Sequence, residues 1–313
     1  MIRQAQLSIL SISLLTIFAA VACTASPTPT PVLTDAVTPT GVLVFGDISD
    51  EAAETINGTQ PIADYLAAQL GDYGISRAEV KIAPDLDTMV QWIADGEVDL
   101  YFDSPYPALV ISQKTGAEPI LRRWKYGVST YHTLFFARAD AGITTVADLQ
   151  GHMIAFEESF STSGYMLPLS YLLEQGLNPV SKESPEVTVA ADEIGYTFST
   201  ADNTTIQWVV SGRVVAGVVD NVTYELFVPE ETRQEFVVLA ETEDVPRQLV
   251  LVRPGMDADL KAAIKSGLLT MDETEEGRAV LDVFLTTEFD EFPEGADAAL
   301  ARMQTLYDLA QSR

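Results

Sequence analysis

The segment with the clearest chemistry is Ser161–Gly164, in which three consecutive hydroxyl side chains precede a glycine. It follows a predicted strand, Met153–Phe156, and begins a predicted helix that ends near Gln175. The hydroxyls, the free N–H groups of the first helical turn and the positive end of the helix dipole would then converge on one point. A helix cap needs only one such hydroxyl. Three of them before a glycine therefore favour an oxyanion-binding loop over a simple cap.

Two other segments place polar side chains beside the ends of predicted strands. Asp103, Ser104 and Tyr106 stand in a loop stiffened by prolines, and Asp220 follows the strand Val214–Val219. Taken singly, the first segment is equally consistent with a packed turn, and the aspartate with a helix cap. Ligands of open α/β sheets bind beyond the carboxyl ends of strands. The three segments together therefore predict one binding site.

Alternating strands and helices are expected to position these loops. The predicted strands are Val42–Phe45, Val80–Ala83, Val98–Phe102, Thr133–Ala137, Met153–Phe156, Val187–Ala190 and Val214–Val219. The predicted helices span residues 59–70, 86–94, 164–175 and 204–211, and the tail 257–313 is expected to be helical and to pack on the first half. Apolar strands that alternate with helices are typical of sheets covered on both faces. The sequence therefore predicts an α/β fold with two doubly wound lobes.

The N-terminus predicts export. Arg3 precedes an apolar run that is too short for a stable membrane span, and small residues stand directly before Cys23. These residues resemble a bacterial lipobox, with Ala20 where leucine is usual; the alternative is cleavage nearby that leaves an incidental thiol. We therefore predict a signal peptide over 1–23 with lipidation at Cys23, and an extended Pro/Thr tether over 24–40. Such a protein would be held on the outer face of the cytoplasmic membrane or lie in the periplasm.

Composition removes several function classes. The 313 residues include 18 basic and 46 acidic side chains, a formal charge of −28, which argues against nucleic acid and anionic lipid as partners. One cysteine excludes a disulfide framework and a thiolate zinc cluster, and two histidines leave little for a histidine-based metal site or triad. Neither a phosphate-cradling Walker loop nor a dinucleotide fingerprint is present. We therefore predict no metal, no cofactor and no catalytic residue.

Several segments resemble one family, the phosphate-, phosphite- and phosphonate-binding proteins of ATP-driven importers. The similar segments are Gly151–Phe156, Ser161–Pro168, Gly96–Leu100 with the proline loop after it, and Tyr131–Thr133. The similarity runs in order from about Gly41 to Glu288. Membership implies a type II periplasmic-binding-protein fold, in which two lobes close on a ligand in the cleft between them. Lobe 1 would comprise residues 41–137 and 229–313, and lobe 2 residues 138–228.

The resemblance also implies how the ligand is held. The hydroxyls and backbone N–H groups of the serine–threonine loop would bind the oxyanion, Asp220 would face them, and two tyrosines would line the cleft. Members often have Gly-Pro where Ser104-Pro105 stands and usually Asp-Pro where Glu158-Ser159 stands. These departures add polar groups and leave the ligand open. The expected ligand-binding residues are Ser161, Thr162, Ser163, Asp220, Tyr106, Tyr131, Glu158, Ser104, Asp103 and His132.

A carboxylate in the cleft predicts rejection of sulfate. Sulfate and an ionised carboxylate are both acceptors only, so that contact would bury like charges. A phosphorus oxyanion can keep a P–OH proton and donate it to Asp220, with help from Glu158 or Asp103, and an aminoalkylphosphonate can offer its ammonium group instead. Phosphate, phosphite and the phosphonates are not distinguished by the sequence.

The predicted function is a monomeric, lipid-anchored solute-binding protein that delivers a phosphorus oxyanion to the permease of an ABC importer. A tethered sensor that reports ligand state to a partner is one alternative. A ferric-ion binder on the same fold is another, because tyrosine and carboxylate oxygens are hard ligands. A hydrolase would need a general base beside Ser161 or Ser163, and neither histidine stands in a motif that marks it as one.

Overall fold

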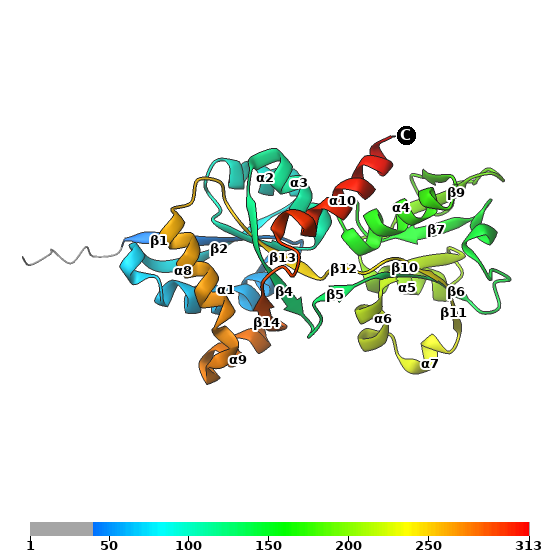
Figure 1. The fold of residues 1–313 in the computed structure, drawn as a ribbon. Helices are drawn as coiled ribbons and strands as arrows, with labels where there is room; N and C mark the ends of the chain where they lie inside the picture. Colours follow the sequence, from blue (N-terminus) through cyan, green and yellow to red (C-terminus); the bar gives the residue numbers. More distant parts are fainter. Residues whose placement is uncertain (1–39, 313) are drawn as a thin grey trace, which may run out of the picture. The chain divides into compact units, whose positions relative to one another are not determined.

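The computed structural model describes residues 40–312, which belong to one compact unit (Figure 1). Within this range, no helix has the length and apolar character needed to cross a membrane. The predicted signal peptide, Cys23 and all but the last residue of the predicted tether lie outside the described residues.

Two six-stranded mixed sheets form the framework. The first has the order β14 (Thr286–Asp290), β4 (Glu118–Lys125), β13 (Gln248–Val252), β3 (Leu100–Asp103), β1 (Gly41–Ile48), β2 (Ile75–Ala83). The second has the order β11 (Phe236–Glu241), β6 (Thr133–Arg138), β10 (Ala216–Asp220), β7 (Met153–Phe156), β9 (Ile194–Phe198), β8 (Pro179–Ser181). In each sheet three or four strands are parallel and the strands at the other edge are antiparallel. We call the first sheet with its helices the first lobe, and the second sheet with its helices the second lobe.

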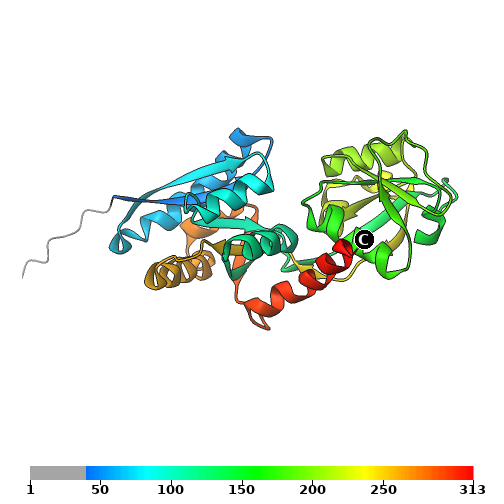
Figure 2. The ribbon, with the colours of Figure 1, turned by 90° about the horizontal axis from the view of Figure 1, so that it is seen from above.

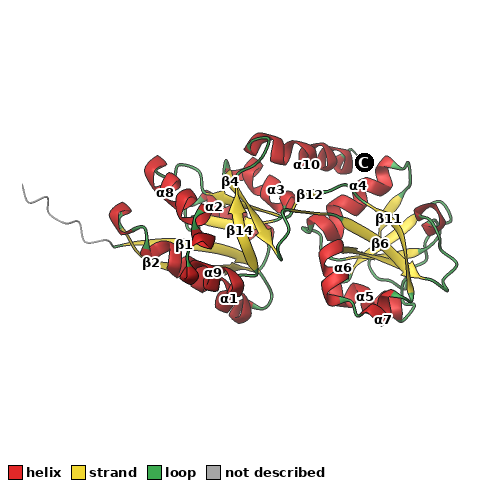
Figure 3. Ribbon diagram, turned by 60° about the horizontal axis from the view of Figure 1, so that its bottom comes forward, coloured by secondary structure: helices red, strands yellow, loops and turns green. Residues whose placement is uncertain are grey.

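Helices cover both faces of the first sheet because its buried strands are apolar on both faces (Figure 3). Leu43 and Phe45 of β1 lie in the cluster with α1, α8 and α9, whereas Val44 packs in the cluster with α2 and α3. The helices are α1 (Ala52–Ala68), α2 (Leu86–Ala94), α3 (Pro105–Thr115), α8 (Ala258–Leu269) and α9 (Glu275–Val283).

The second sheet is covered in the same way. Phe135 and Phe156 pack in the cluster that includes α4, whereas Phe136 and Ala155 pack on the opposite side with α5 and α6. The side chains of β6 therefore alternate between the two faces of the sheet and pack in two separate apolar clusters. This explains why all but its last residue are buried. The helices are α4 (Leu167–Glu174), α5 (Asp202–Val210), α6 (Asn221–Phe227) and the short α7 (Glu230–Arg233).

Two short strands connect the lobes. The chain enters the second lobe through β5 (Thr130–Tyr131) and returns through β12 (Val245–Pro246), and these strands pair antiparallel. The C-terminal helix α10 (Ala296–Gln311), red in Figure 2, contacts α3 of the first lobe and α4 of the second. A buried apolar cluster that includes Tyr131 and Met303 fills this junction.

The boundaries between the two lobes lie at different residues from those that we predicted. The prediction assigned 41–137 and 229–313 to lobe 1, but β6 and β11 belong to the second sheet. Both pair within it, since β6 bonds antiparallel to β10 and to β11. The second lobe therefore extends over about Thr133 to Glu241, and β6 begins this lobe instead of ending the first.

Three local expectations also differ. Residues 187–190 form no strand, and the strand beside β7 is β9, which begins at Ile194. The loop after β3 is a helix start, because α3 begins at Pro105, where a proline is well tolerated. The tail contains the strand β14, and its last helix contacts both lobes.

Candidate functional site

A polar cavity of about 210 Å³ lies where the two lobes face each other. It is lined from the first lobe by β3, β4, β13 and their ends, from the second lobe by the ends of β7, β9 and β10, and by the connecting strands. The lining residues are Asp103, Ser104, Lys125, Tyr126, Tyr131, Glu157, Ser161, Ser163, Asp202, Asp220, Thr223, Arg247 and Gln248. The three segments that the sequence singled out therefore do meet at one cavity.

The serine–threonine loop forms a π-helical turn, Thr162–Met166, directly before α4. The Oγ of Ser161 accepts from the N–H of Gly164 at 2.9 Å, so this serine is the cap of the turn as well as a cavity wall. Glycine is required at 164, because a Cβ there would lie 2.4 Å from the Cβ of Glu157. The close approach holds Ser161 and Ser163 at the cavity.

Thr162 does not line the cavity. Its side chain is fully buried, its Oγ1 donates to the Oγ of Ser104 at 2.9 Å, and it accepts from the backbone N–H of Tyr106 at 2.8 Å. Both partners belong to the first lobe. The threonine hydroxyl, which the resemblance assigned to the oxyanion, is a bridge between the lobes in this structure.

Asp220 lines the cavity and also caps α6. One carboxylate oxygen accepts from the N–H groups of Val222 and Thr223, each at 3.0 Å, and the other accepts from the Thr223 hydroxyl at 2.6 Å. The cap was the alternative interpretation of this residue. Three donors leave little free acceptor capacity for a ligand.

On the first lobe, Asp103 and Ser104 form the cavity wall at the end of β3. Asp103 accepts from the hydroxyl of Tyr101 and from the N–H of Ser104. Burial raises the pKa of Asp103, and the hydrogen bonds from Tyr101 and Ser104 oppose that shift. The wall is therefore a hydrogen-bonded unit whose ionisation is costly.

Arg247 provides a buried cation with unmet hydrogen-bonding capacity. The residue is 8% exposed, and its Nε has no hydrogen-bond partner among the described residues. Its guanidinium lies over the ring of Tyr131 at 4.3 Å. Burial raises the pKa of Tyr131 to about 12, so this hydroxyl stays protonated and can donate. A buried guanidinium N–H without an acceptor is unfavourable unless a ligand anion supplies one.

Lys125 adds a second cation at the end of β4. Burial is the main cause that lowers its pKa to about 8, and repulsion from Arg247 and Arg123 adds to the shift. Arg123 lies close by but is satisfied internally, since it donates to Thr286 and Gln248, each at 2.7 Å. Of these cations, Lys125 and Arg247 are the ones that line the cavity.

Carboxyl groups face these cations from the second lobe. Burial raises the pKa of Glu157, and the charge of Asp220 raises it further. Asp202, at the start of α5, has its pKa raised well above the usual value by burial and then by Glu157 and Asp220. The lining thus contains four acidic and two basic side chains, a formal charge of 2 − 4 = −2.

Besides Thr162, three expected residues lie outside the cavity lining, namely Tyr106, Glu158 and His132. The ring of Tyr106 packs between Tyr165 and Tyr307, with centroids 6.4 and 6.0 Å away, outside the cavity lining. Glu158 is also outside the lining, and burial with repulsion from Glu157 raises its pKa to about 7.

His132 is bound at the connection between the lobes, where its Nδ1 lies 2.9 Å from Oδ1 of Asp244. It does not line the cavity either. Of the ten expected residues, the cavity gathers Ser161, Ser163, Asp220, Tyr131, Ser104 and Asp103.

Four charged residues of the cavity were missed. Glu157 and Asp202 obey the same rule that located the other loops, because Glu157 directly follows the parallel strand β7 and Asp202 starts the helix after the parallel strand β9. Lys125 and Arg247 carry no such signal, because β4 and β12 reach the cavity through antiparallel pairing that the sequence pattern did not show.

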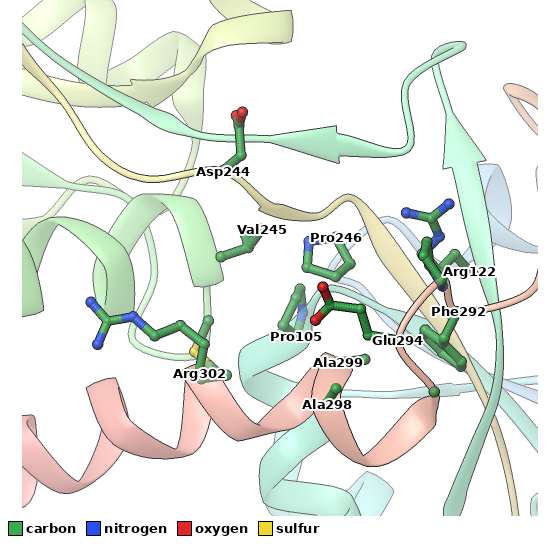
Figure 4. Close-up of a pocket in the computed structure, with 13 residues that line it drawn as sticks. Pro105, Arg122, Asp244, Val245, Pro246, Phe292, Glu294, Ala298, Ala299 and Arg302 are labelled. Carbon is green, nitrogen blue, oxygen red and sulfur yellow. The ribbon is translucent and has the colours of Figure 1, made fainter.

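A second pocket, of about 260 Å³, lies beside α10 (Figure 4). Its walls include Pro105, Val245, Pro246 and Met303, and its arginines are already paired. Arg122 bonds to Asp290 through Nε at 2.9 Å, and Arg302 bonds to Glu174 at 2.9 Å. This pocket therefore has no comparable unmet charge, and the interlobe cavity is the candidate binding site.

Comparison with known proteins identifies the family. A family model described as "ABC transporter, phosphonate, periplasmic substrate-binding protein" matches residues 45–299. This chain belongs to that family. Families of this kind bind solutes for transport and are not enzymes, and the family resemblance expected from the sequence is confirmed.

Individual relatives agree with this assignment. Phosphate-import protein PhnD of Mycolicibacterium smegmatis is 31% identical over 136 residues, which cover 42% of this chain and 40% of that protein. The match thus spans less than half of this curated relative. XAC2383 from Xanthomonas citri, bound to a chloride ion, is 30% identical, with a TM-score of 0.81 over 87% of this chain and 98% of that one.

The fold prediction is also confirmed. PhnD1 from Prochlorococcus marinus, in complex with methylphosphonate, has a TM-score of 0.67 at 15% identity, over 85% of this chain and 97% of that one. At this identity the likeness concerns the fold, which is that of type II periplasmic binding proteins.

Proposed function

We propose that this chain is the solute-binding protein of an ABC importer and binds a phosphonate in the interlobe cavity. The observation that carries the proposal is Arg247, a buried guanidinium at the cavity with no partner for its Nε. Phosphonate oxygens match a guanidinium well, because each can accept a short charge-assisted hydrogen bond. The family and the curated relative support transport as the role.

The phosphonate group is assigned to the cationic part of the cavity. Lys125 and Arg247 would neutralise its charge, and the hydroxyls of Ser163 and Tyr131 would donate to its oxygens. Ser104 lies next to them, with its N–H and hydroxyl engaged by Asp103. Thr162 is assigned a different role from the one the family resemblance implies, namely to hold the lobes together around the ligand.

The surplus of carboxyl groups favours a ligand that also carries a positive charge. A dianion alone would enter a lining that already has a formal charge of −2. An ammonium group beside Glu157 and Asp202 would add to the counter-charge of the two cavity cations, which leaves the pKa of both carboxyls raised. We therefore propose a zwitterionic aminoalkylphosphonate of two or three carbons as the preferred ligand.

Calorimetric titration with a matched ligand pair tests both parts. 2-Aminoethylphosphonate and propylphosphonate have nearly the same shape, but only the first has an ammonium group. We expect 2-aminoethylphosphonate to bind at least about tenfold more tightly, from one new charged pair. The variant Glu157→Gln should reduce that preference, because it weakens the contact with the ammonium group and removes an acidic side chain that opposes the propylphosphonate dianion.

The outcomes separate the two claims. Equal affinities would refute the ammonium site and leave the phosphonate site standing. Failure of phosphate, phosphite, methylphosphonate and 2-aminoethylphosphonate alike to bind would refute the phosphonate site. Sulfate serves as the control anion, which the carboxyl-rich lining should reject.

Anchoring and the alternatives remain proposals of the same kind. The mass of the mature protein tests the lipidation of Cys23, and sedimentation tests whether the protein is a monomer. A sensor role would require a signalling partner in place of the permease. For the ferric-ion alternative, no group of three or more His, Cys, Asp or Glu side chains is arranged to hold a metal within residues 40–312.

A further inference from the structure

Tyr126 is a cavity wall held in an unusual backbone conformation. It follows Lys125 at the end of β4, and its φ of 58° lies in the left-handed region, which is uncommon for a bulky residue. Its N–H donates to the carbonyl of Leu285 at 2.9 Å, and Leu285 itself has a φ of 53°. Strained residues persist only where their surroundings hold them, and they cluster at functional sites.

The ring of Tyr126 meets the second lobe at Phe227. The two ring centroids are 5.6 Å apart with an interplanar angle of 67°, an edge-to-face arrangement. Phe227 is the last residue of α6 and is 52% exposed. A large apolar side chain this exposed buries little against its own lobe, so its main ring contact is with the opposite lobe.

Both partners belong to elements that hold the cavity. Lys125 stands directly before Tyr126, and α6 begins at the cavity with Asp220 as its cap and Thr223 in its first turn. If the lobes separate, the contact between the two rings is lost. While the rings are in contact, Tyr126 stays at the cavity. The aromatic pair is thus linked on each side to a residue that would touch the ligand.

We propose that Tyr126 and Phe227 form an aromatic latch that retains the ligand by holding the lobes together. Tyr126 lines the cavity, and Phe227 is a positioning residue that acts through its contact with Tyr126. The part of this inference that concerns ligand retention rests on the proposed phosphonate site. The part that concerns the lobes does not, because the ring contact involves only residues of the chain itself.

Three variants provide the test. Phe227→Ala removes the ring, Phe227→Tyr keeps it, and Leu226→Ala is the matched control. Leu226 is the preceding residue and is 61% exposed. Both positions are at the surface end of a helix, so folding is expected to be retained, and circular dichroism checks this.

Stopped-flow measurement of 2-aminoethylphosphonate release gives the first readout. We expect Phe227→Ala to release it roughly three- to tenfold faster, the effect of losing one edge-to-face ring pair. Phe227→Tyr and Leu226→Ala should match the wild type. Equal release rates for Phe227→Ala and Leu226→Ala would overturn the latch.

Small-angle scattering without ligand gives the second readout and separates the two proposals. Phe227→Ala should have a larger radius of gyration than Leu226→Ala, because its lobes separate more often. If the wild type binds no phosphorus oxyanion, the proposed function fails and the latch is judged on this measurement alone. An unchanged radius in Phe227→Ala would refute it.

Discussion

The interlobe cavity and the pocket beside α10 are similar in volume, about 210 and 260 Å³, and each is lined by two basic side chains. They differ in what those side chains contact. Arg122 and Arg302 of the pocket are paired with carboxylates, whereas Arg247 of the cavity has a buried Nε without a partner. The basic side chains of the pocket therefore have their partners within the chain, whereas one N–H group at the cavity does not. Unmet charge, more than size, therefore distinguishes the interlobe cavity as the candidate site.

The strongest test of this contrast is Arg247→Met. We expect binding of 2-aminoethylphosphonate to weaken by about 2–4 kcal/mol, because the phosphonate loses a buried charged partner. Thermal unfolding of the ligand-free variant should shift to a lower temperature, because the acidic side chains of the lining lose one of their two cations. Calorimetry and thermal unfolding measure the two effects. Arg122→Met in the other pocket is the control, and an equal loss of affinity there would contradict the contrast.

The pH dependence of binding should follow Lys125. Its pKa of about 8 means that the ammonium group is lost as the pH rises through that value. Affinity for 2-aminoethylphosphonate should therefore fall about tenfold from pH 7 to pH 9. Lys125→Arg stays charged and should flatten the profile, whereas an unchanged profile would exclude Lys125 from the site.

The same lysine predicts the sign of the stability change without ligand. Its pKa is lowered from 10.5 to about 8 on folding, so the unfolded chain binds more protons between these values. The free energy of unfolding should therefore increase with pH across that window. Denaturant unfolding of the wild type beside Lys125→Arg isolates this contribution.

Thr162→Val should have a smaller and less selective effect. The change removes the bond to Ser104 and leaves the N–H of Tyr106 without its acceptor, at a cost of about 1 kcal/mol. Because the threonine bridges the lobes, we expect 2-aminoethylphosphonate, methylphosphonate and phosphate to weaken equally in calorimetry. A loss confined to one ligand would mean that Thr162 contacts the ligand directly, as the family resemblance implies.

The smallest effect is expected for Arg302→Met. Its ion pairs with Glu174 and Glu243 involve side chains that are about 40% exposed, and such pairs contribute less than about 1 kcal/mol to stability. Ligand affinity should be unchanged within error. A large loss of affinity would give the pocket beside α10 a part in binding.

The sequence predicted the parts of the fold that depend on local pattern. Helix α2 was placed at its observed bounds because the residue pattern of a helix is local. The error in the lobe boundary has a non-local cause, since β6 is a buried strand whichever sheet it joins. Only its pairing with β10 and β11 assigns it to the second lobe.

The site shows the same division. Ser161, Ser163 and Asp220 were found because parallel strands end beside them. The role of Thr162 depends on Ser104, which accepts from its hydroxyl, and on the N–H of Tyr106, and both belong to the other lobe. The capping role of Asp220 is local, because its donors lie two and three residues further on, and the sequence offered it as the alternative. Arg247 has no local signature, and its importance comes from burial without a partner, which only the folded chain reveals.

The position of β13 sets an order in which the molecule can be assembled during synthesis. This strand lies between β3 and β4, yet it begins at Gln248, after the whole second lobe. As the chain emerges from its N-terminus, the second lobe is complete once Glu241 has passed, while the first sheet still lacks its middle strand. Until then β3 and β4 present open edges that can pair with other chains. The first lobe is therefore the aggregation-sensitive half of the emerging chain, although its residues emerge first.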